Sequence, residues 1–219
     1  MTAQSAPLVI AIDGPAAAGK GTLARRLAAH YGLAYLDSGS LYRGTALSLL
    51  RQGLAAPDEA AAVAAAQALK PELLADPAIR AEATGALASR VAAIPAVRAA
   101  LLAWQRGFAA RPPAGLRGAV LDGRDIGTVV LPDAMVKFFV TASDEARAMR
   151  RFQELQGRGE AAIYPTVLED MRERDARDTA RSTAPMRPAE DSVIIDTSAF
   201  DADEVFRRAT DHIDRRTRS

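Results

Sequence analysis

The chain has 219 residues, of which 49% are hydrophobic, enough to bury one core and to form a single domain with a subsidiary insert. Its 28 Lys and Arg residues nearly balance 27 Asp and Glu, so no bulk charge favours nucleic acid or an anionic membrane as a partner. Cysteine is absent, which excludes disulfides and thiolate metal sites. With no leader-like start and no long apolar run, we expect a cytoplasmic protein.

Short apolar runs bounded by Asp or Gly alternate along the chain with longer helical patterns. Such alternation predicts βα units and a parallel sheet. We expect an α/β fold, in which a five-stranded, doubly wound parallel sheet is wrapped by helices. The expected strands are 8–12, 33–36, 116–121, 135–140 and 192–195.

Two further segments stand out between and after these strands. An alanine-rich stretch at about 57–110 has helical periodicity and is divided by prolines at 57, 71, 77 and 95, which indicates a helical insert. The segment 157–181 is the most charged part of the chain. Its Gly157-Arg-Gly159 break precedes a second helical run, so we expect a loop followed by a helix there.

A glycine-rich loop follows the first expected strand and opens a helical pattern. A turn of this kind directs successive backbone N–H groups at one anion, and the helix N-terminus adds partial positive charge. Lys20 would then reach the β- and γ-phosphate oxygens of ATP. Gly21 stands where the general pattern has Ser or Thr, with Thr22 next, and an ordinary β-to-α turn is the alternative interpretation. The expected ATP-binding residues are Gly14, Pro15, Ala16, Ala17, Ala18, Gly19, Lys20, Gly21 and Thr22.

Two more polar segments follow strands and would therefore meet at the carboxyl edge of the sheet, where such folds bind ligands. The second strand leads into Ser38 and Arg43, and Ser38 is either a helix cap or a ligand contact. The third strand leads into Arg124 and Asp125. A buried strand that ends in Asp-Gly-Arg-Asp favours a functional loop over a bland surface loop.

Five motifs occur in one order and spacing: AIDGPAAAGKGT, LDSGSLYR, ASRVAAIPAVR, LDGRDIGTVVLPDA and ERDARDTAR. Together they resemble the bacterial cytidylate kinases, which are nucleoside monophosphate kinases among the P-loop NTPases. The resemblance covers nearly the whole chain and implies transfer of the γ-phosphoryl group of ATP to CMP or dCMP, with Mg²⁺, in pyrimidine metabolism. It also implies a monomer with a core of about 1–54, 112–156 and 182–219, an NMP-binding insert of about 55–111, and a lid of about 157–181.

The resemblance assigns roles to individual side chains, with CMP between the core and the insert. Cytosine would contact Ser89, Arg98 and Asp125, whereas Ser38 and Arg124 would lie near the acceptor phosphate with Arg43 in support. On the lid, Arg174 and Asp178 would approach the sugar and phosphate, and Arg177 and Arg181 the phosphates. The expected catalytic set is Lys20, Arg124, Arg174, Arg177 and Arg181. No protein ligand is assigned to Mg²⁺, which the ATP phosphates and water would hold.

The chemistry of the base supports part of this assignment independently. Cytosine presents an amino donor beside two acceptors, which suits a carboxylate together with donating Arg and Ser side chains. Uracil would place a carbonyl oxygen against Asp125, and two acceptors facing each other in a dry pocket reject that base. From their helices alone, Ser89 and Arg98 would more often be solvated surface residues. Composition alone likewise favours a salt-bridged solvent face for 173–181.

The reaction itself needs no general base, because the acceptor oxygen is already anionic. Catalysis would consist of positioning and charge neutralisation, with Gly157 and Gly159 as hypothetical hinges of the lid. The competing functions are a UMP or AMP kinase, a regulatory nucleotide-binding module and a P-loop ATPase acting on nucleic acid. The first conflicts with the cytosine pattern, the second with the intact lysine and arginines, and the third with the balanced charge.

Overall fold

The computed structural model describes residues 7–56 and 58–217. The chain forms two compact units, the first made of Met1–Leu36 and Arg111–Ser219 and the second of Asp37–Ala110. Each unit has its own packing and is described by itself.

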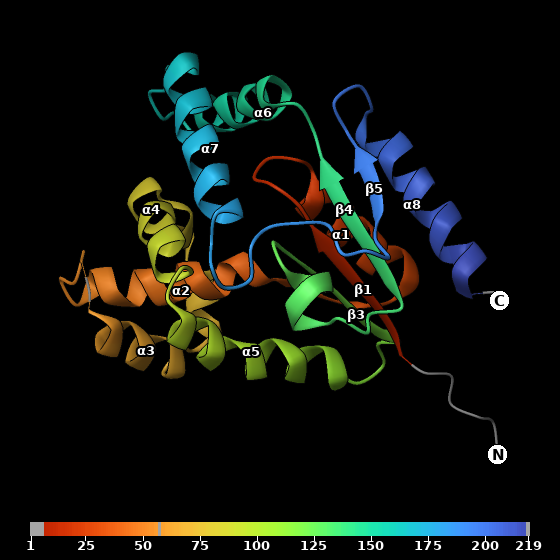
Figure 1. Cartoon of the computed structure of the whole chain (residues 1–219), viewed down its shortest axis with the longest axis horizontal. Helices are drawn as coiled ribbons and strands as arrows, with labels where there is room; N and C mark the ends of the chain where they lie inside the picture. Colours follow the sequence, from red (N-terminus) through yellow and green to blue (C-terminus); the bar gives the residue numbers. More distant parts are fainter. Residues whose placement is uncertain (1–6, 57, 218–219) are drawn as a thin grey trace. The chain divides into compact units, whose positions relative to one another are not determined.

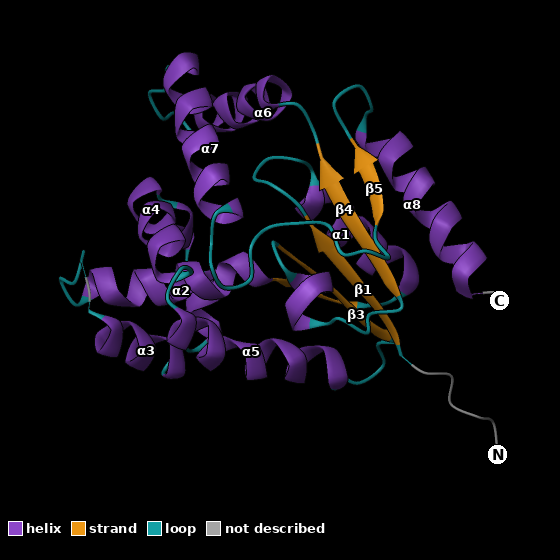
Figure 2. Cartoon of the chain, viewed as in Figure 1, coloured by secondary structure: helices purple, strands orange, loops and turns teal. Residues whose placement is uncertain are grey.

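The first unit is built on a parallel sheet, and five strands form it within the described residues (Figures 1 and 2). They are β1 (Leu8–Asp13), β2 (Ala34–Asp37), β3 (Gly118–Gly123), β4 (Val136–Thr141) and β5 (Val193–Asp196). Their order is β2-β3-β1-β4-β5, so β1 is central and pairs in parallel with β3 and with β4. This order confirms the predicted fold and makes the carboxyl end of β1 the switch point of the sheet.

All five predicted strands occur, and β1 begins at Leu8 as predicted, whereas every other strand end lies one or two residues further toward the C-terminus. The displacement is largest before β3, where Leu116 is part of a turn that its amide closes on the carbonyl of Pro113 at 3.1 Å. Met135 likewise precedes β4 and is exposed. An apolar residue at the edge of a run is therefore no reliable marker of where pairing begins.

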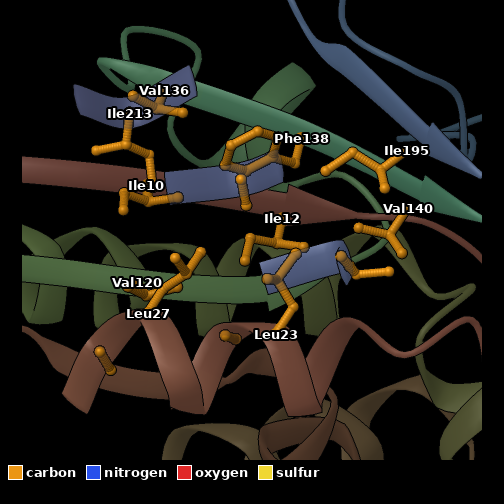
Figure 3. Close-up of a cluster of buried hydrophobic side chains, with 14 of the residues drawn as sticks. Ile10, Ile12, Leu23, Leu27, Val120, Val136, Phe138, Val140, Ile195 and Ile213 are labelled. Carbon is orange, nitrogen blue, oxygen red and sulfur yellow. The ribbon is translucent and has the colours of Figure 1, made fainter. Parts of the chain in front are cut away.

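Helices α1 (Lys20–Tyr31) and α8 (Ala202–Thr217) pack together and join the sheet in one apolar cluster (Figure 3). Leu23 and Leu27 lie one turn apart on α1, and Ile213 comes from α8. They meet the strand residues Ile10 and Phe138, both of which are fully buried. Each such side chain stabilises the fold by about 1.5–3 kcal/mol through burial.

Three more elements complete this unit. The short π-helical turn η3 (Ile126–Val130) follows β3 directly, and helices α6 (Asp144–Gly157) and α7 (Tyr164–Thr179) pack against each other after β4. Gly157 ends α6, and Gly159 in the connection to α7 has a φ of 74°, a conformation that favours glycine. The predicted loop and following helix are confirmed, whereas the role of these glycines as hinges stays a prediction.

The second unit is helical throughout, as its alanine-rich sequence predicts. It contains α2 (Ser38–Arg51), α3 (Glu59–Gln67), η1 (Pro71–Ala75), η2 (Pro77–Arg80), α4 (Glu82–Val91) and α5 (Pro95–Ala110). Helix α2 packs against α3 and α4, and α3 packs against α5. Pro71, Pro77 and Pro95 each begin a helix, because a residue without an N–H loses nothing at that position. The remaining proline of this stretch, Pro57, lies outside the described residues.

The compact unit begins at Asp37, before α2, whereas the predicted insert begins at about residue 55. The difference follows from the contacts of α2 with α3 and α4, which sequence spacing does not reveal. The functional division into core, NMP-binding insert and lid stays a prediction.

In the part of the chain that the structure describes, no single helix has the length and apolar character to cross a membrane. The bent pair Glu82–Val91 and Pro95–Ala110 meets those two criteria only when its two helices are taken together.

Candidate active site

The phosphate loop begins where β1 ends and closes into α1, as predicted. Gly14 has a φ of 139°, and a Cβ at this position would lie 1.9 Å from the carbonyl oxygen of Val140. Gly19, with a φ of 94°, precedes the first residue of α1. Both positions therefore require glycine. Lys20 is buried and its Nζ donates to the carbonyl of Pro15 at 2.7 Å, which folds the lysine back over the loop.

Three successive carbonyl groups of this loop accept hydrogen bonds from side chains behind it. Arg147 donates to Ala16 at 3.3 Å and Arg150 donates to Ala17 at 3.4 Å. The hydroxyl of Thr197 approaches the carbonyl of Ala18 at 3.0 Å. Because the C=O and N–H of one trans peptide point in opposite directions, the next N–H groups face the other side of the loop. These contacts give the loop the geometry of a backbone anion site.

Arg147 also connects this loop to the helix that carries the predicted lid arginines. Its guanidinium is almost fully buried and pairs with Asp175 on α7 and with Asp144 at the start of α6. Its Nε donates to the carbonyl of Ala142 at 3.1 Å. The phosphate loop and α7 therefore share one buried guanidinium.

The loop after β3 brings two predicted site residues into the same unit. Asp125 is buried, and Arg124 donates from Nε to Oδ2 of Asp178 on α7 at 3.0 Å. On β3 itself, the buried carboxylate of Asp122 accepts from the hydroxyl of Tyr35 at 3.0 Å. Acidic and basic side chains thus gather at the carboxyl end of the sheet, beside the phosphate loop.

Asp178 is the centre of a cluster of arginines. It is 2% exposed, and its Oδ1 pairs with Arg181 while its Oδ2 accepts from Arg124. Burial alone would raise the pKa of Asp178, but the guanidinium groups of Arg124, Arg181 and Arg174 outweigh it and hold the pKa below its usual range. Three of the predicted catalytic arginines are therefore assembled around one carboxylate.

Arg177 does not belong to this cluster in the structure. Its side chain is 58% exposed and pairs with Glu173 at 3.6 Å, one turn earlier on α7. This is the salt-bridged solvent face that composition alone indicates for the segment. Contact between Arg177 and phosphate remains a prediction.

The four other predicted CMP contacts lie in the helical unit. Arg98 is 8% exposed, donates to the carbonyl of Ala92 at 3.3 Å and lies over the ring of Tyr42. Arg43 donates to the carbonyl of Ile79 at 3.1 Å, and Ser38 is buried as the first residue of α2. The hydroxyl oxygen of Ser89 is shielded from solvent and, among the described residues, has no hydrogen-bond partner. Neither Ser89 nor Arg98 is therefore an ordinary solvated surface residue.

Sequence reasoning missed four residues that shape the site: Asp13, Arg147, Arg150 and Thr197. Asp13 lies within the motif AIDGPAAAGKGT, directly before Gly14. Its position at the end of a strand that leads into the phosphate loop could have indicated a role in the site. The other three lie outside every motif, and only tertiary contacts bring them to the loop. Among the described residues, no group of three or more acidic, His or Cys side chains could hold a metal ion.

Comparison with known proteins identifies the family. The profile of the cytidylate kinases matches residues 10–215. The chain belongs to the cytidylate kinase family. A cytidylate kinase of Paramagnetospirillum magneticum is 60% identical over 201 residues, which cover 92% of this chain and 95% of that protein. One from a Methylobacterium species is 62% identical over 185 residues, covering 84% and 86%.

Membership makes the chain a nucleoside monophosphate kinase, a transferase whose phosphoryl donor is ATP. Among solved structures, an uncharacterized protein from Eubacterium ventriosum aligns over 94% of this chain and 98% of its own, with a TM-score of 0.55 and 15% identity. At that identity the likeness concerns the fold alone. The cytidylate kinase family also accounts for the phosphate loop.

Proposed function

We propose that the chain transfers the γ-phosphoryl group of ATP to CMP or dCMP and releases ADP with CDP or dCDP. Family membership supports this reaction, and the observation that carries the mechanism is the arrangement of charge in the sheet unit. There the phosphate loop with Lys20 and the cluster of Arg124, Arg174 and Arg181 around Asp178 belong to one compact body. Two anionic substrates need such a set of cations.

ATP would bind with its phosphates on the N–H groups of the loop. Lys20 already curves over this loop, so a small rotation of its side chain brings the ammonium group to the β- and γ-oxygens. Magnesium bound with ATP would neutralise charge on the phosphate oxygens. Because Mg²⁺ prefers oxygen ligands and keeps several waters, phosphate oxygens and water would hold most of it.

The arginine cluster would stabilise the transferred group. Asp178 pairs with Arg124 and Arg181, and Arg174 is close enough to lower its pKa, so three guanidinium groups are held in one small region. Phosphate oxygens would compete for the same guanidinium groups when the substrates bind. The acceptor oxygen is already anionic, so positioning and charge stabilisation replace general base catalysis.

Cytosine recognition is assigned to Asp125 in the sheet unit and to Ser89 and Arg98 in the helical unit. Asp125 would accept from the exocyclic amino group, and the two donors would serve N3 and O2. The buried position of Asp125 and Arg98 supports this assignment, since a base is read best where water is excluded. Ser38 and Arg43 are assigned to the acceptor phosphate. Monomeric state and cytoplasmic location remain predictions.

The test is steady-state ADP formation from magnesium ATP with CMP, dCMP, UMP or AMP as separate acceptors. We expect strong turnover with CMP and dCMP only. Turnover mainly with UMP or AMP would contradict the assignment of Asp125. ATP binding without turnover on any acceptor would place the chain among regulatory nucleotide-binding proteins.

A further inference from the structure

The carboxylate of Asp13 joins the end of β1 to the loop that follows β3. Its Oδ1 accepts from the amide of Ile126 and its Oδ2 from the amide of Gly127, both at 2.7 Å. Asp13 is 3% exposed and immediately precedes Gly14, the first residue of the phosphate loop. One side chain therefore uses both of its oxygens to hold a neighbouring backbone segment.

That backbone segment carries the base-reading carboxylate. Ile126 and Gly127 begin η3, so their amides belong to the first turn, where helical donors have no partner within the helix. The carbonyl of Asp125 accepts from Val129 at 2.9 Å and from Val130 at 3.1 Å within the same turn. The orientation of Asp125 is thus fixed by η3, and η3 is fixed by Asp13.

We propose that Asp13 is a positioning residue which sets the selectivity for CMP over UMP by fixing the backbone of Asp125 relative to the phosphate loop. The proposal rests on the function proposed above, because selectivity is defined only for that reaction. Asp13 touches neither substrate in this scheme. Its effect passes through two charge-assisted hydrogen bonds, which are shorter and stronger than neutral ones.

The surroundings of Asp13 make this clamp sensitive to protonation. Burial raises the pKa of Asp13 to about 6, although the hydrogen bonds from the amides of Gly127 and Ile126 lower it in part. The charge of Asp125 raises the pKa further and that of Lys20 lowers it. The side chain of Lys137 also approaches this place, since a Cβ added to Gly127 would meet both Lys137 Cδ, at 3.2 Å, and Asp13 Oδ2, at 3.4 Å. A protonated carboxyl keeps one carbonyl acceptor, but its hydroxyl oxygen is a much poorer acceptor than a carboxylate oxygen, so one of the two bonds is weakened.

The first test is Asp13→Asn, which keeps the size of the side chain but turns an NH₂ group toward one amide. The ratio of kcat/KM for CMP to that for UMP should fall about tenfold to a hundredfold, the scale on which small misplacements act. The KM for ATP should change much less. Ile213→Val is the matched control, since it loosens the core on α8 without touching η3 and should leave the ratio unchanged.

Two further measurements keep the test decisive if Asp13→Asn fails to fold. In Gly127→Ala the new Cβ would lie 3.2 Å from Lys137 Cδ and 3.4 Å from Asp13 Oδ2, so either the lysine stem or the contact between Gly127 and Asp13 must shift by a few tenths of an ångström, with the carboxylate intact. The selectivity ratio should again fall. In the unaltered enzyme the ratio should fall as pH decreases from about 7.5 to about 5.5. Both acceptors carry the same phosphate, so its own titration near pH 6 cancels in the ratio.

The outcomes separate this proposal from the proposed function. If the unaltered enzyme does not prefer CMP at about pH 7.5, the proposed function is wrong. If it prefers CMP, but the ratio stays within about twofold in folded Asp13→Asn, the positioning role is overturned. For an unfolded Asp13→Asn, an unchanged ratio in Gly127→Ala together with a flat pH profile overturns it equally.

Discussion

Arg124 and Asp178 meet across the sheet unit, with Nε and Oδ2 3.0 Å apart, and this pair joins the loop after β3 to the end of α7. Arg124 is 19% exposed, whereas Asp178 is 2% exposed and also pairs with Arg181. The carboxylate is therefore a structural counter-ion for two arginines to which the proposed function gives catalytic roles. Its removal should affect both stability and turnover.

Asp178→Asn should lower the free energy of unfolding by about 3 kcal/mol near neutral pH. This is the lower end of the range of stability losses seen when one partner of a buried ion pair is removed. The pKa of Asp178 is lower in the folded state than the ordinary value of 3.8, which applies to the unfolded chain. The ionised carboxylate therefore contributes stability that is fully present above pH 3.8 and is lost as pH falls through the folded-state pKa. The difference from the unaltered enzyme should therefore shrink in acid, as urea titrations can show. Glu173→Gln, at an exposed pair on the same helix, should change stability by less than about 0.5 kcal/mol.

Lys20→Ala should reduce kcat/KM for ATP by about 10² to 10³, the usual loss for one preorganised electrostatic group. The KM for CMP should change little, because the phosphate loop serves the donor. Lys70→Ala removes an exposed ammonium of the helical unit and serves as the control. Equal losses in the two variants would show that Lys20 acts through overall charge and not through its place over the loop.

The elements that the sequence predicted are those set by local pattern. The strand at 8–12 followed by Gly14 and Gly19 fixes the phosphate loop, because strand, turn and helix start are all encoded within a few residues. Chain order alone also places the loop after β3 beside it, since parallel strands end at one edge. The prolines at 71, 77 and 95 marked helix starts for the same local reason.

What the sequence could not predict depends on contacts between distant segments. The hydrogen bond from Arg147 to Ala16 spans 131 residues, and that from Arg150 to Ala17 spans 133. Neither arginine differs in local pattern from the exposed arginines around it. Burial distinguishes Arg147, and it accompanies the packing of α6 against α7. Arg150 is only half-buried, and its contacts with Ala17 and Thr197 alone set it apart.

Arg147→Lys should raise the KM for ATP about tenfold while leaving that for CMP nearly unchanged. An ammonium group cannot reproduce the fork of a guanidinium, so contacts to Ala16, Ala142 and Asp175 are not all kept. Steady-state titration of each substrate at saturating levels of the other measures the two effects. Arg207→Lys, on the exposed face of α8, is the matched control. A rise in both KM values would indicate a general loss of structure.

Gly14→Ala should prevent stable folding, with a loss above about 4 kcal/mol. The added Cβ would lie 1.9 Å from the carbonyl oxygen of Val140, and a backbone atom cannot rotate away. Gly53→Ala separates the clash from backbone strain, since Gly53 has a φ of 76° with no atom within 4 Å of the added Cβ. The control should lose only about 1 kcal/mol. Comparable urea midpoints for the two variants would contradict the prediction.

The raised pKa of Asp13 predicts a pH dependence of stability opposite in sign to that of Asp178. Burial moves this pKa from 3.8 to about 6, so between these values the folded state binds more protons than the unfolded state. Stability conferred by Asp13 is therefore greatest below about pH 4 and falls as pH rises to about 6, by at most about 3 kcal/mol. Subtracting the unfolding free energies of Asp13→Asn from those of the unaltered enzyme removes the titration of groups that do not interact with Asp13, and leaves that of Asp13 with its coupling to Asp125 and Lys20. The difference in unfolding free energy should decrease from about pH 4.5 to pH 7. A difference that stays constant over this range would show that Asp13 is already ionised in acid. It would also remove the reason to expect selectivity for CMP to depend on pH.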